Sequence, residues 1–324
     1  MTEEIESQLK GARNVFFGIL KGIDSKVKIK LPTHVYHYTS WDCYRSMLET
    51  NSVRLHTVSN FEDTLERKHE FSVENRISGM ITDKESGQTY DLASILNTEL
   101  SNDHIFIQSN TTSDKNKYLW NNYGDQGKGI CLCFSTKNYL KLLGETLTDF
   151  ELLPDYLKCC YVSYSNEWAD HFMEMILPAI QQTDTKLGSS GYLVWFFFLE
   201  YWKNFMKGPD PYKAENEVRF VVSDNYSIFL EMCSVLAKWG LFSSPFPMEL
   251  SDAFHKEYVE RKNQIRSRLS FSENEKSKFL SIPLDKILES ITIGPNASFT
   301  KNDVSAQTNG KVKKSRISKS YLIL

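Results

Sequence analysis

Two glutamates and an arginine alternate in the segment 215–222, which reads Glu-Asn-Glu-Val-Arg-Phe-Val-Val. Successive side chains of a β-strand point to opposite faces, so a strand here would place Glu215, Glu217 and Arg219 on one face, with the carboxylates roughly 7 Å apart. Such a pair can divide labour: one carboxylate stabilises a developing oxocarbenium ion, while the other orients or deprotonates a nucleophile. Arg219 would keep both ionised. The alternative is a solvated strand face on which Arg219 neutralises two acids.

A histidine and two aromatic residues could complete a ligand site beside this strand. His37 lies in a segment typical of a strand, residues 35–39, and Ser40 can cap a helix that follows directly. Helix N-termini attract anions, so a phosphate or ribose could dock near His37. The alternative is a histidine that bonds a backbone carbonyl. Trp120 and Tyr123, on a polar loop ahead of another strand, could stack a flat ring or act as core anchors.

The cysteines do not predict a metal site. The chain contains Cys43, Cys131, Cys133, Cys159, Cys160 and Cys233. Cys131 and Cys133 would share a strand face, but no nearby Cys or His completes a set of four ligands. We therefore expect no metal and interpret all six as small buried hydrophobic residues.

The sequence patterns around these residues predict strands and helices that together form an α+β fold. We expect strands at residues 35–39, 53–58, 104–108, 129–134, 215–222, 291–293 and 312–324. We also expect a mostly buried helix over residues 192–207. The predicted organisation is an N-terminal helical extension, residues 1–30, and one α+β domain, residues 31–324, with a helical insertion at about 225–280.

Composition places the chain among ordinary globular proteins. Of 324 residues, 41% are apolar and 24% charged, and the net charge of -3 offers no global attraction to nucleic acid. The basic run at residues 311–319 could contact phosphate, but lysines also protect edge strands, which is the interpretation we favour. No apolar run reaches the roughly 18 residues of a membrane span, and the first twenty residues do not form a signal peptide. We expect a cytoplasmic protein that does not bind membranes.

Several short motifs lie at residues 36–40, 60–66, 119–125, 128–130, 215–219 and 291–295. In this order they resemble the bacterial domain-of-unknown-function family twenty-nine seventy-one. The resemblance covers about residues 33–322. Two positions depart from the family pattern: the acidic loop at 61–66 lacks the usual Asn and Pro, and Ser109-Asn110-Thr111 stands where Ser-Phe-Ser is usual.

The order of these motifs is similar to that of the ADP-ribosyltransferase superfamily of the His-Tyr-Glu type. The resemblance implies a split, twisted mixed β-sheet and NAD as the substrate. His37 would bond the adenosine-side ribose, and Tyr123 would stack the nicotinamide. Tyr38, Thr39 and Arg219 are predicted as further NAD-binding residues.

The same resemblance implies a mechanism. Glu217, the second acid of a Glu-x-Glu pattern, would hold the nicotinamide ribose and stabilise its oxocarbenium ion, and Glu215 would face the acceptor. This predicts an NAD-dependent ADP-ribosyltransferase or an NAD glycohydrolase, with a protein, a nucleic acid or water as acceptor. The alternative is a non-catalytic nucleotide- or nucleic-acid-binding module, for example in bacterial phage defence.

Overall fold

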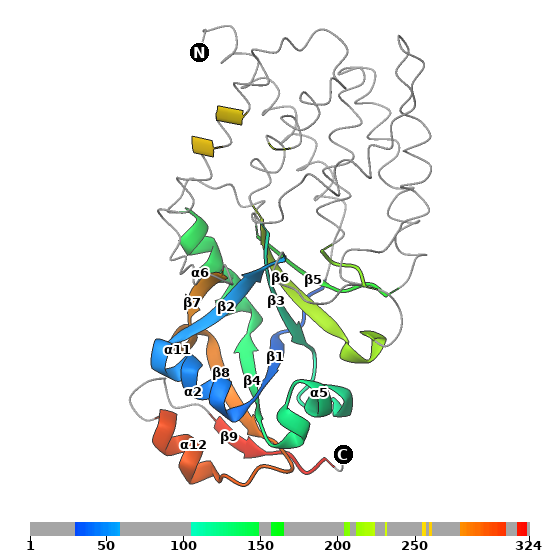
Figure 1. Ribbon diagram of the computed structural model, residues 1–324, viewed down its shortest axis with the longest axis vertical. Coiled ribbons are helices and arrows are strands. Elements are labelled where there is room, and N and C mark those ends of the chain that lie inside the picture. Colours follow the sequence, from blue (N-terminus) through cyan, green and yellow to red (C-terminus); the bar gives the residue numbers. More distant parts are fainter. Residues whose placement is uncertain are drawn as a thin grey trace, which may run out of the picture.

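One twisted, unclosed mixed sheet dominates the computed structural model (Figure 1). The structure describes residues 30–58, 105–148, 157–164, 204–207, 212–223, 231, 255–256, 259–260, 279–308 and 316–322. The strands in this part of the chain are β1 (His34–Thr39), β2 (Ser52–Thr57), β3 (Ile105–Thr111), β4 (Ile130–Ser135), β5 (Leu157–Tyr161), β6 (Glu217–Ser223), β7 (Phe279–Pro283), β8 (Leu288–Ile293) and β9 (Arg316–Lys319). The helices are α2 (Trp41–Thr50), α5 (Lys117–Asn122), α6 (Thr136–Thr148), α11 (Leu284–Ile287) and α12 (Lys301–Thr308), with 3-10 turns η3 (Asp125–Gly127) and η6 (Tyr212–Glu215).

Strand β3 is where the sheet divides. The main path of the sheet is β5-β6-β3-β1-β4-β8-β9, and every pair along it is antiparallel except β8 with β9. One edge of β3 pairs with β6 along its whole length. The other edge is shared, because β2 pairs at Phe106 and Ile107 whereas β1 pairs at Thr111. Between these pairings, residues 108–110 face a gap between β1 and β2 that no described strand fills. We call this gap the fork.

Helix α2 holds the fork open by linking the end of β1 to the start of β2. Ser40 caps the helix by accepting a hydrogen bond from the Cys43 backbone N–H at 3.2 Å. Asn51 ends it in the left-handed conformation, with φ 46°. Tyr44 and Leu48 are the buried residues of α2. The helix is therefore fixed at both ends, so β1 and β2 leave β3 at set positions.

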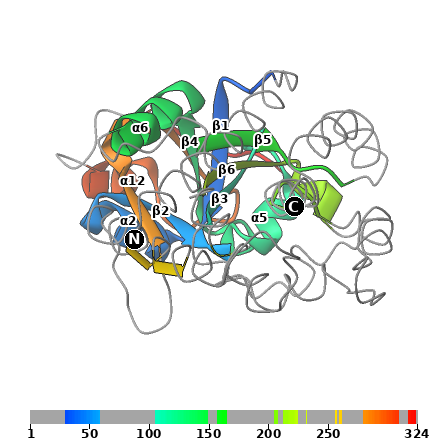
Figure 2. The same ribbon diagram turned by 90° about the horizontal axis from the view of Figure 1, so that it is seen from above.

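The two faces of the sheet are covered by different helices. Figures 1 and 2 place α2 and α6 on one side of β1 and β4, and α5 on the other. On the α6 side, the rings of Tyr139 and Phe220 stack with centroids 3.9 Å apart. On the α5 side, Tyr38 meets Trp120 edge to face at 4.8 Å. Because Phe220 points toward α6, alternation along β6 turns Glu217 and Arg219 toward the other face.

Most predicted strands are confirmed, with shifted ends. The strands expected at residues 35–39, 53–58, 104–108, 129–134 and 291–293 correspond to β1, β2, β3, β4 and β8. The last strand is shorter than expected. Among the described strands it lies at the edge of the sheet, so residues 316–319 of the basic run belong to an edge strand, as predicted. Strands β5 and β7 and helices α6 and α12 were not predicted.

Other predictions fail or lie outside the described residues. The helix expected over residues 192–207 does not reach Lys207, because Asn204 and Phe205 form a turn and Met206 bridges to Ser163. Residues 1–29, the acidic loop at 60–66 and most of the segment 225–280 are outside the described part. Within that part, no helix is long and apolar enough to cross a membrane.

Glycine is required where three strands meet near the fork. A Cβ on Gly129 would lie far inside van der Waals distance of the Thr39 carbonyl oxygen, and one on Gly294 would clash with the Gly127 carbonyl oxygen. Backbone therefore packs directly on backbone at both positions. The motifs at 128–130 and 291–295 thus fix the end of β1, which carries Thr39.

Candidate functional site

A cavity of about 500 Å³ occupies the fork. Its walls come from β1, α2, β2, β3, the C-terminal end of α5 and the segments that carry Lys207, Glu215 and Glu217. The predicted site residues that line it are His37, Tyr38, Thr39, Tyr123, Glu215 and Glu217. The fold therefore brings together residues that lie far apart in the sequence, in a space of the size that small-molecule sites have. Arg219 is not among the lining residues.

Glu217 is held by a buried arginine, Arg219. Arg219 donates from Nε to Glu217 Oε1 at 2.5 Å and from Nη2 to Oε2 at 3.1 Å. The third arm, Nη1, donates to the Asn204 carbonyl at 2.6 Å. Arg219 is 1% exposed and Glu217 is 3% exposed. A two-pronged contact of this kind fixes both the position and the charge of the carboxylate.

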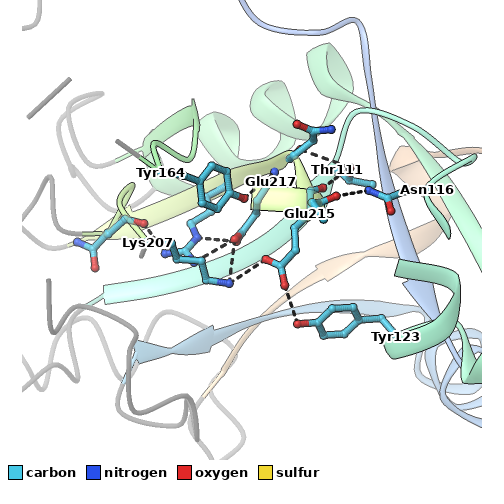
Figure 3. A network of polar contacts seen from close by, with 11 residues as sticks. Thr111, Asn116, Tyr123, Tyr164, Lys207, Glu215 and Glu217 are labelled. Atoms are coloured by element: carbon cyan, nitrogen blue, oxygen red, sulfur yellow. Dashed lines mark hydrogen bonds and ion pairs between the residues drawn. The ribbon is translucent and has the colours of Figure 1, made fainter. Parts of the chain in front are cut away.

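Lys207 joins the two glutamates. Its Nζ lies 3.0 Å from Glu215 Oε2 and 3.2 Å from Glu217 Oε2. The other oxygen of Glu215 accepts a 2.9 Å hydrogen bond from the Tyr123 hydroxyl. Figure 3 shows Tyr123 reaching Glu215 from the side opposite Lys207. Two buried glutamates and the two buried cations Lys207 and Arg219 therefore form one network, with Tyr123 at its edge.

The two carboxyl groups of this network have opposite pKa shifts. Burial alone would raise the pKa of Glu217, but Arg219 and Lys207 outweigh it and lower that pKa to about 2. Burial raises the pKa of Glu215, and the nearby charge of Glu217 adds to the effect, while Lys207 opposes it. Glu217 therefore stays ionised, and Glu215 is the member of the pair better suited to accept a proton.

Two details of the predicted acidic strand are wrong. Strand β6 begins at Glu217, and Glu215 lies in η6 instead, since Asn216 between them is left-handed with φ 46°. The Thr111 hydroxyl donates to the Glu215 carbonyl at 2.8 Å and stabilises this turn. The face is also buried rather than solvated, so the solvated-face interpretation fails. The carboxylates still converge, because Lys207 contacts both.

His37 contacts a backbone carbonyl, as the alternative to a ligand-binding role predicted. It also lines the cavity. Its Nδ1 lies 3.2 Å from the Ser109 carbonyl oxygen, which can only accept, so Nδ1 carries the proton. Burial lowers the pKa of His37, which makes the ring neutral at pH 7. In that tautomer Nε2 is a hydrogen-bond acceptor, and no described residue donates to it. A ligand hydroxyl, such as that of a ribose, is a suitable donor.

Tyr38 and Trp120 make hydrogen bonds within the protein. The Tyr38 hydroxyl donates to the Ser113 carbonyl at 2.9 Å and accepts from the Asn116 N–H at 3.0 Å. Trp120 is fully buried in α5, rather than on a loop, which confirms it as a core anchor. Thr39 is buried and ends β1 at the cavity wall.

Tyr123, by contrast, is half exposed, with 50% of its surface accessible. It follows α5 directly, and it belongs to the cavity wall. Its ring can therefore meet a ligand while its hydroxyl stays on Glu215.

The cysteines are mostly buried, as expected, with one correction. Cys131, Cys133, Cys159 and Cys160 are buried, whereas Cys43 is exposed on α2. Cys233 lies outside the described residues. Among the residues that the structure describes, no group of three or more His, Cys, Asp or Glu side chains could hold a metal ion.

Sequence reasoning missed two residues that organise the site. Lys207 was assigned only to the end of the mostly buried helix expected over residues 192–207 and given no role in the site, yet it is only 7% exposed and contacts both glutamates. A lone lysine at the end of an apolar run must be paired when buried, which is the signal that could have found it. Ser109 contributes its side chain to the Glu217 carboxylate and its carbonyl to His37. The only sequence feature that pointed to Ser109 was its position in Ser109-Asn110-Thr111, which departs from the usual Ser-Phe-Ser of the family.

Comparisons with family models, with curated proteins and with solved structures gave no match to this chain. The interpretation of the site therefore depends on its geometry: one cavity at a fork in the sheet, lined by a neutral histidine, a half-exposed tyrosine and two buried glutamates.

Proposed function

We propose that this chain binds NAD in the fork cavity and cleaves its bond between nicotinamide and ribose, as an ADP-ribosyltransferase or an NAD glycohydrolase. The observation that carries the proposal is the convergence of His37, Tyr123 and Glu217 on one cavity. The motif order assigns these three residues to one NAD site, and mutual geometry is the first test of such an assignment.

The contacts of these residues suit their proposed roles. His37 offers an acceptor nitrogen to the adenosine-side ribose. The exposed ring of Tyr123 offers a stacking surface to nicotinamide, which is flat and cationic in NAD. Glu217 and His37 are also linked through Ser109, so the binding residue and the catalytic residue are held in one frame.

The proposed reaction is a substitution at C1 of the nicotinamide ribose. The bond from C1 to the nicotinamide nitrogen breaks, its electron pair leaves with nicotinamide, and the sugar becomes an oxocarbenium ion. Glu217, ionised throughout, lies beside this positive charge and stabilises it. Water or an acceptor group then attacks C1 and gives up a proton, which Glu215 is placed to receive.

A second candidate function is nucleotide binding without catalysis. The observation that favours it is the engagement of Glu217, whose two oxygens already bond Arg219 and Lys207. A carboxylate neutralised in this way stabilises a cation less than a bare one. In this case the network would shape the cavity, and NAD or a related nucleotide would be bound and released unchanged.

Two measurements separate these functions from each other and from nucleic-acid binding. Thermal unfolding with NAD, ADP-ribose or short oligonucleotides tests the ligand, because a ligand at about a hundred times its Kd stabilises by about 2.7 kcal/mol. Nicotinamide release tests the chemistry. We expect NAD and ADP-ribose to stabilise the protein, and nicotinamide to accumulate with NAD. Stabilisation by oligonucleotide alone would overturn the NAD proposal, and stabilisation by NAD without nicotinamide release would favour the binding module.

A further inference from the structure

The described wall of the fork cavity contains two cationic side chains, Lys207 and Arg54, and they differ in their partners. Lys207 lies between the carboxylates of Glu215 and Glu217, so its charge is already balanced. Arg54, on β2, is exposed, and within the described part of the chain its guanidinium contacts no carboxylate. A cation without a counter-charge in the wall of a cavity attracts an anionic ligand.

Strand β2 turns Arg54 and His56 away from the core. The residues that alternate with them, Val53, Leu55 and Thr57, are each at most 1% exposed. Arg54 is exposed and His56 is half-buried, as expected for residues on the opposite face of the strand. Because both also line the cavity, their side chains are accessible to a ligand that enters it.

This face of β2 continues into the face of the sheet that carries Glu217. His56 pairs with Ile107 on β3. Thr111, four residues further along β3, pairs with Glu217 on β6. Paired residues of antiparallel strands share a face, and so do residues an even number apart on one strand. Arg54, His56 and Glu217 therefore lie on the same face, and all three line the one cavity.

An aromatic ring supports Arg54 without using its charge. The guanidinium carbon lies 4.2 Å from the centroid of the Phe279 ring, and Phe279 pairs with His56 across β2 and β7. This contact leaves the N–H donors of the guanidinium to a ligand. Burial, together with the charge of Arg54, lowers the pKa of His56, so its ring is neutral at pH 7 and has one N–H donor.

We infer that Arg54 and His56 form an anion subsite that binds the diphosphate of the nucleotide. The cavity then offers three different groups: an acceptor nitrogen from His37 on β1, a cation from β2 and the Glu217 carboxylate from β6. NAD carries the complementary groups in one molecule: ribose hydroxyls, a diphosphate between two riboses, and a ribose that becomes cationic. A planar guanidinium can bond two phosphate oxygens at once. In naming a nucleotide as the source of the phosphate, the inference rests on the proposed function.

The test is a binding comparison that needs no catalysis. ADP and adenosine, which differ in the diphosphate, are titrated by calorimetry against the wild type and Arg54→Gln. We expect the wild type to bind ADP at least about tenfold more tightly than adenosine, because the charge-assisted contact exists only with ADP. In Arg54→Gln the ADP affinity should fall about tenfold and the adenosine affinity should stay unchanged. Arg54→Lys, which keeps the charge but loses the planar fork, should have an intermediate ADP affinity.

A second variant tests the histidine. His56→Phe keeps a flat ring beside Phe279 but removes the N–H donor, and it should weaken ADP binding about fivefold without affecting adenosine. The matched control is Arg45→Gln, since Arg45 is an exposed arginine of α2 that pairs with Asp42 and is not among the lining residues. Its ADP affinity should stay within about twofold of the wild type.

Three results would overturn the inference. The first is an equal ADP affinity of the wild type and Arg54→Gln, which would make Arg54 a surface residue supported only by Phe279. The second is an equal loss of ADP and adenosine affinity in Arg54→Gln, and the third is a wild type that binds neither. Inorganic pyrophosphate tests the source of the anion: if it bound as tightly as ADP, the assignment to a nucleotide would be overturned.

The outcome separates this inference from the proposed function. ADP binding that depends on Arg54, without nicotinamide release from NAD, would support the anion subsite and contradict catalysis. Nicotinamide release with the same KM and kcat in the wild type and Arg54→Gln would support catalysis and overturn the anion subsite.

Discussion

Glu215 and Glu217 share one cation: Lys207 Nζ lies 3.0 Å from the first carboxylate and 3.2 Å from the second. The sharing is unequal. Glu217 also has the two-pronged contact with Arg219, whereas the Glu215 carboxylate, among the residues that the structure describes, has only the Tyr123 hydroxyl in addition. The two acids are therefore expected to respond differently to the same substitution.

Glu217→Gln should lower the free energy of unfolding by about 3–5 kcal/mol, because it leaves the guanidinium of Arg219 buried without its counter-charge. Glu215→Gln should lower it by at most about 1 kcal/mol, because Lys207 keeps Glu217 as a partner. Urea unfolding of both variants measures the difference. In the double variant Glu217→Gln/Arg219→Met, which removes both charges, most of the lost stability should return. Equal effects of the two single variants would contradict the unequal network.

The stability of the protein should fall in acid through Glu217. Its pKa is lowered to about 2 in the folded state from an ordinary value of 4.5. A lowered carboxyl pKa contributes stability that is complete above the unfolded value and is lost as pH falls through the folded one, here between about 4.5 and 2. The contribution is roughly 3 kcal/mol.

Glu215, whose pKa is raised, acts in the opposite direction, so the measurement is best made in Glu215→Gln. Unfolding free energies between pH 6 and pH 2 should fall in this background and fall much less when Glu217→Gln is added. If both proteins lost the same unfolding free energy between pH 6 and pH 2, Glu217 would not be the cause of the loss.

Tyr123 should affect only ligands that carry nicotinamide. Tyr123→Ala removes the proposed stacking surface and should weaken NAD binding about tenfold, since stacking on an aromatic ring contributes about 1–3 kcal/mol. Tyr123→Phe keeps the ring and should stay within about twofold of the wild type. ADP, which has no nicotinamide, should bind both variants normally. Titration calorimetry measures all three proteins, and an equal loss of ADP affinity in Tyr123→Ala would place Tyr123 elsewhere in the ligand site.

Two glycines should respond in opposite ways to alanine. Gly129→Ala forces a Cβ onto the Thr39 carbonyl at the end of β1 and should destabilise the protein by several kcal/mol. At Gly144, in helix α6, a Cβ would meet no atom of the described residues within 4 Å apart from its chain neighbours and the backbone of its own helix, so Gly144→Ala should stabilise the protein by about 0.5–1 kcal/mol. Thermal unfolding gives both values. Tolerance of alanine at position 129 would show that the close approach to Thr39 is not required.

The sequence predicted the strands of the site better than their connections. Alternating and β-branched residues marked β1, β2, β3, β4 and β8, because those patterns depend on local geometry. The fork could not be read in this way, since it depends on how β1 and β2 share one edge of β3. That choice is made by pairing between distant segments.

The acidic motif shows the same limit at the level of single residues. Period-two alternation placed Glu215 and Glu217 on one strand, but the left-handed Asn216 moves Glu215 into η6. The burial of both glutamates was not predicted either. Lys207, whose charge offsets the cost of burying them, comes from a segment outside the motif. Pairing across the chain, rather than local pattern, sets the chemistry of these carboxylates.

The most direct test of the central claim is nicotinamide release from NAD by the wild type and by Glu217→Gln, with ADP-ribose binding measured in parallel to show that the variant is folded. An oxocarbenium ion gains its charge only as nicotinamide leaves, so the neutral amide should lower kcat by on the order of a hundredfold or more. The Kd for ADP-ribose should change little. If the wild type and a folded Glu217→Gln variant released nicotinamide equally fast, the proposed role of Glu217 would be contradicted. If the wild type bound NAD without releasing nicotinamide, catalysis itself would be contradicted.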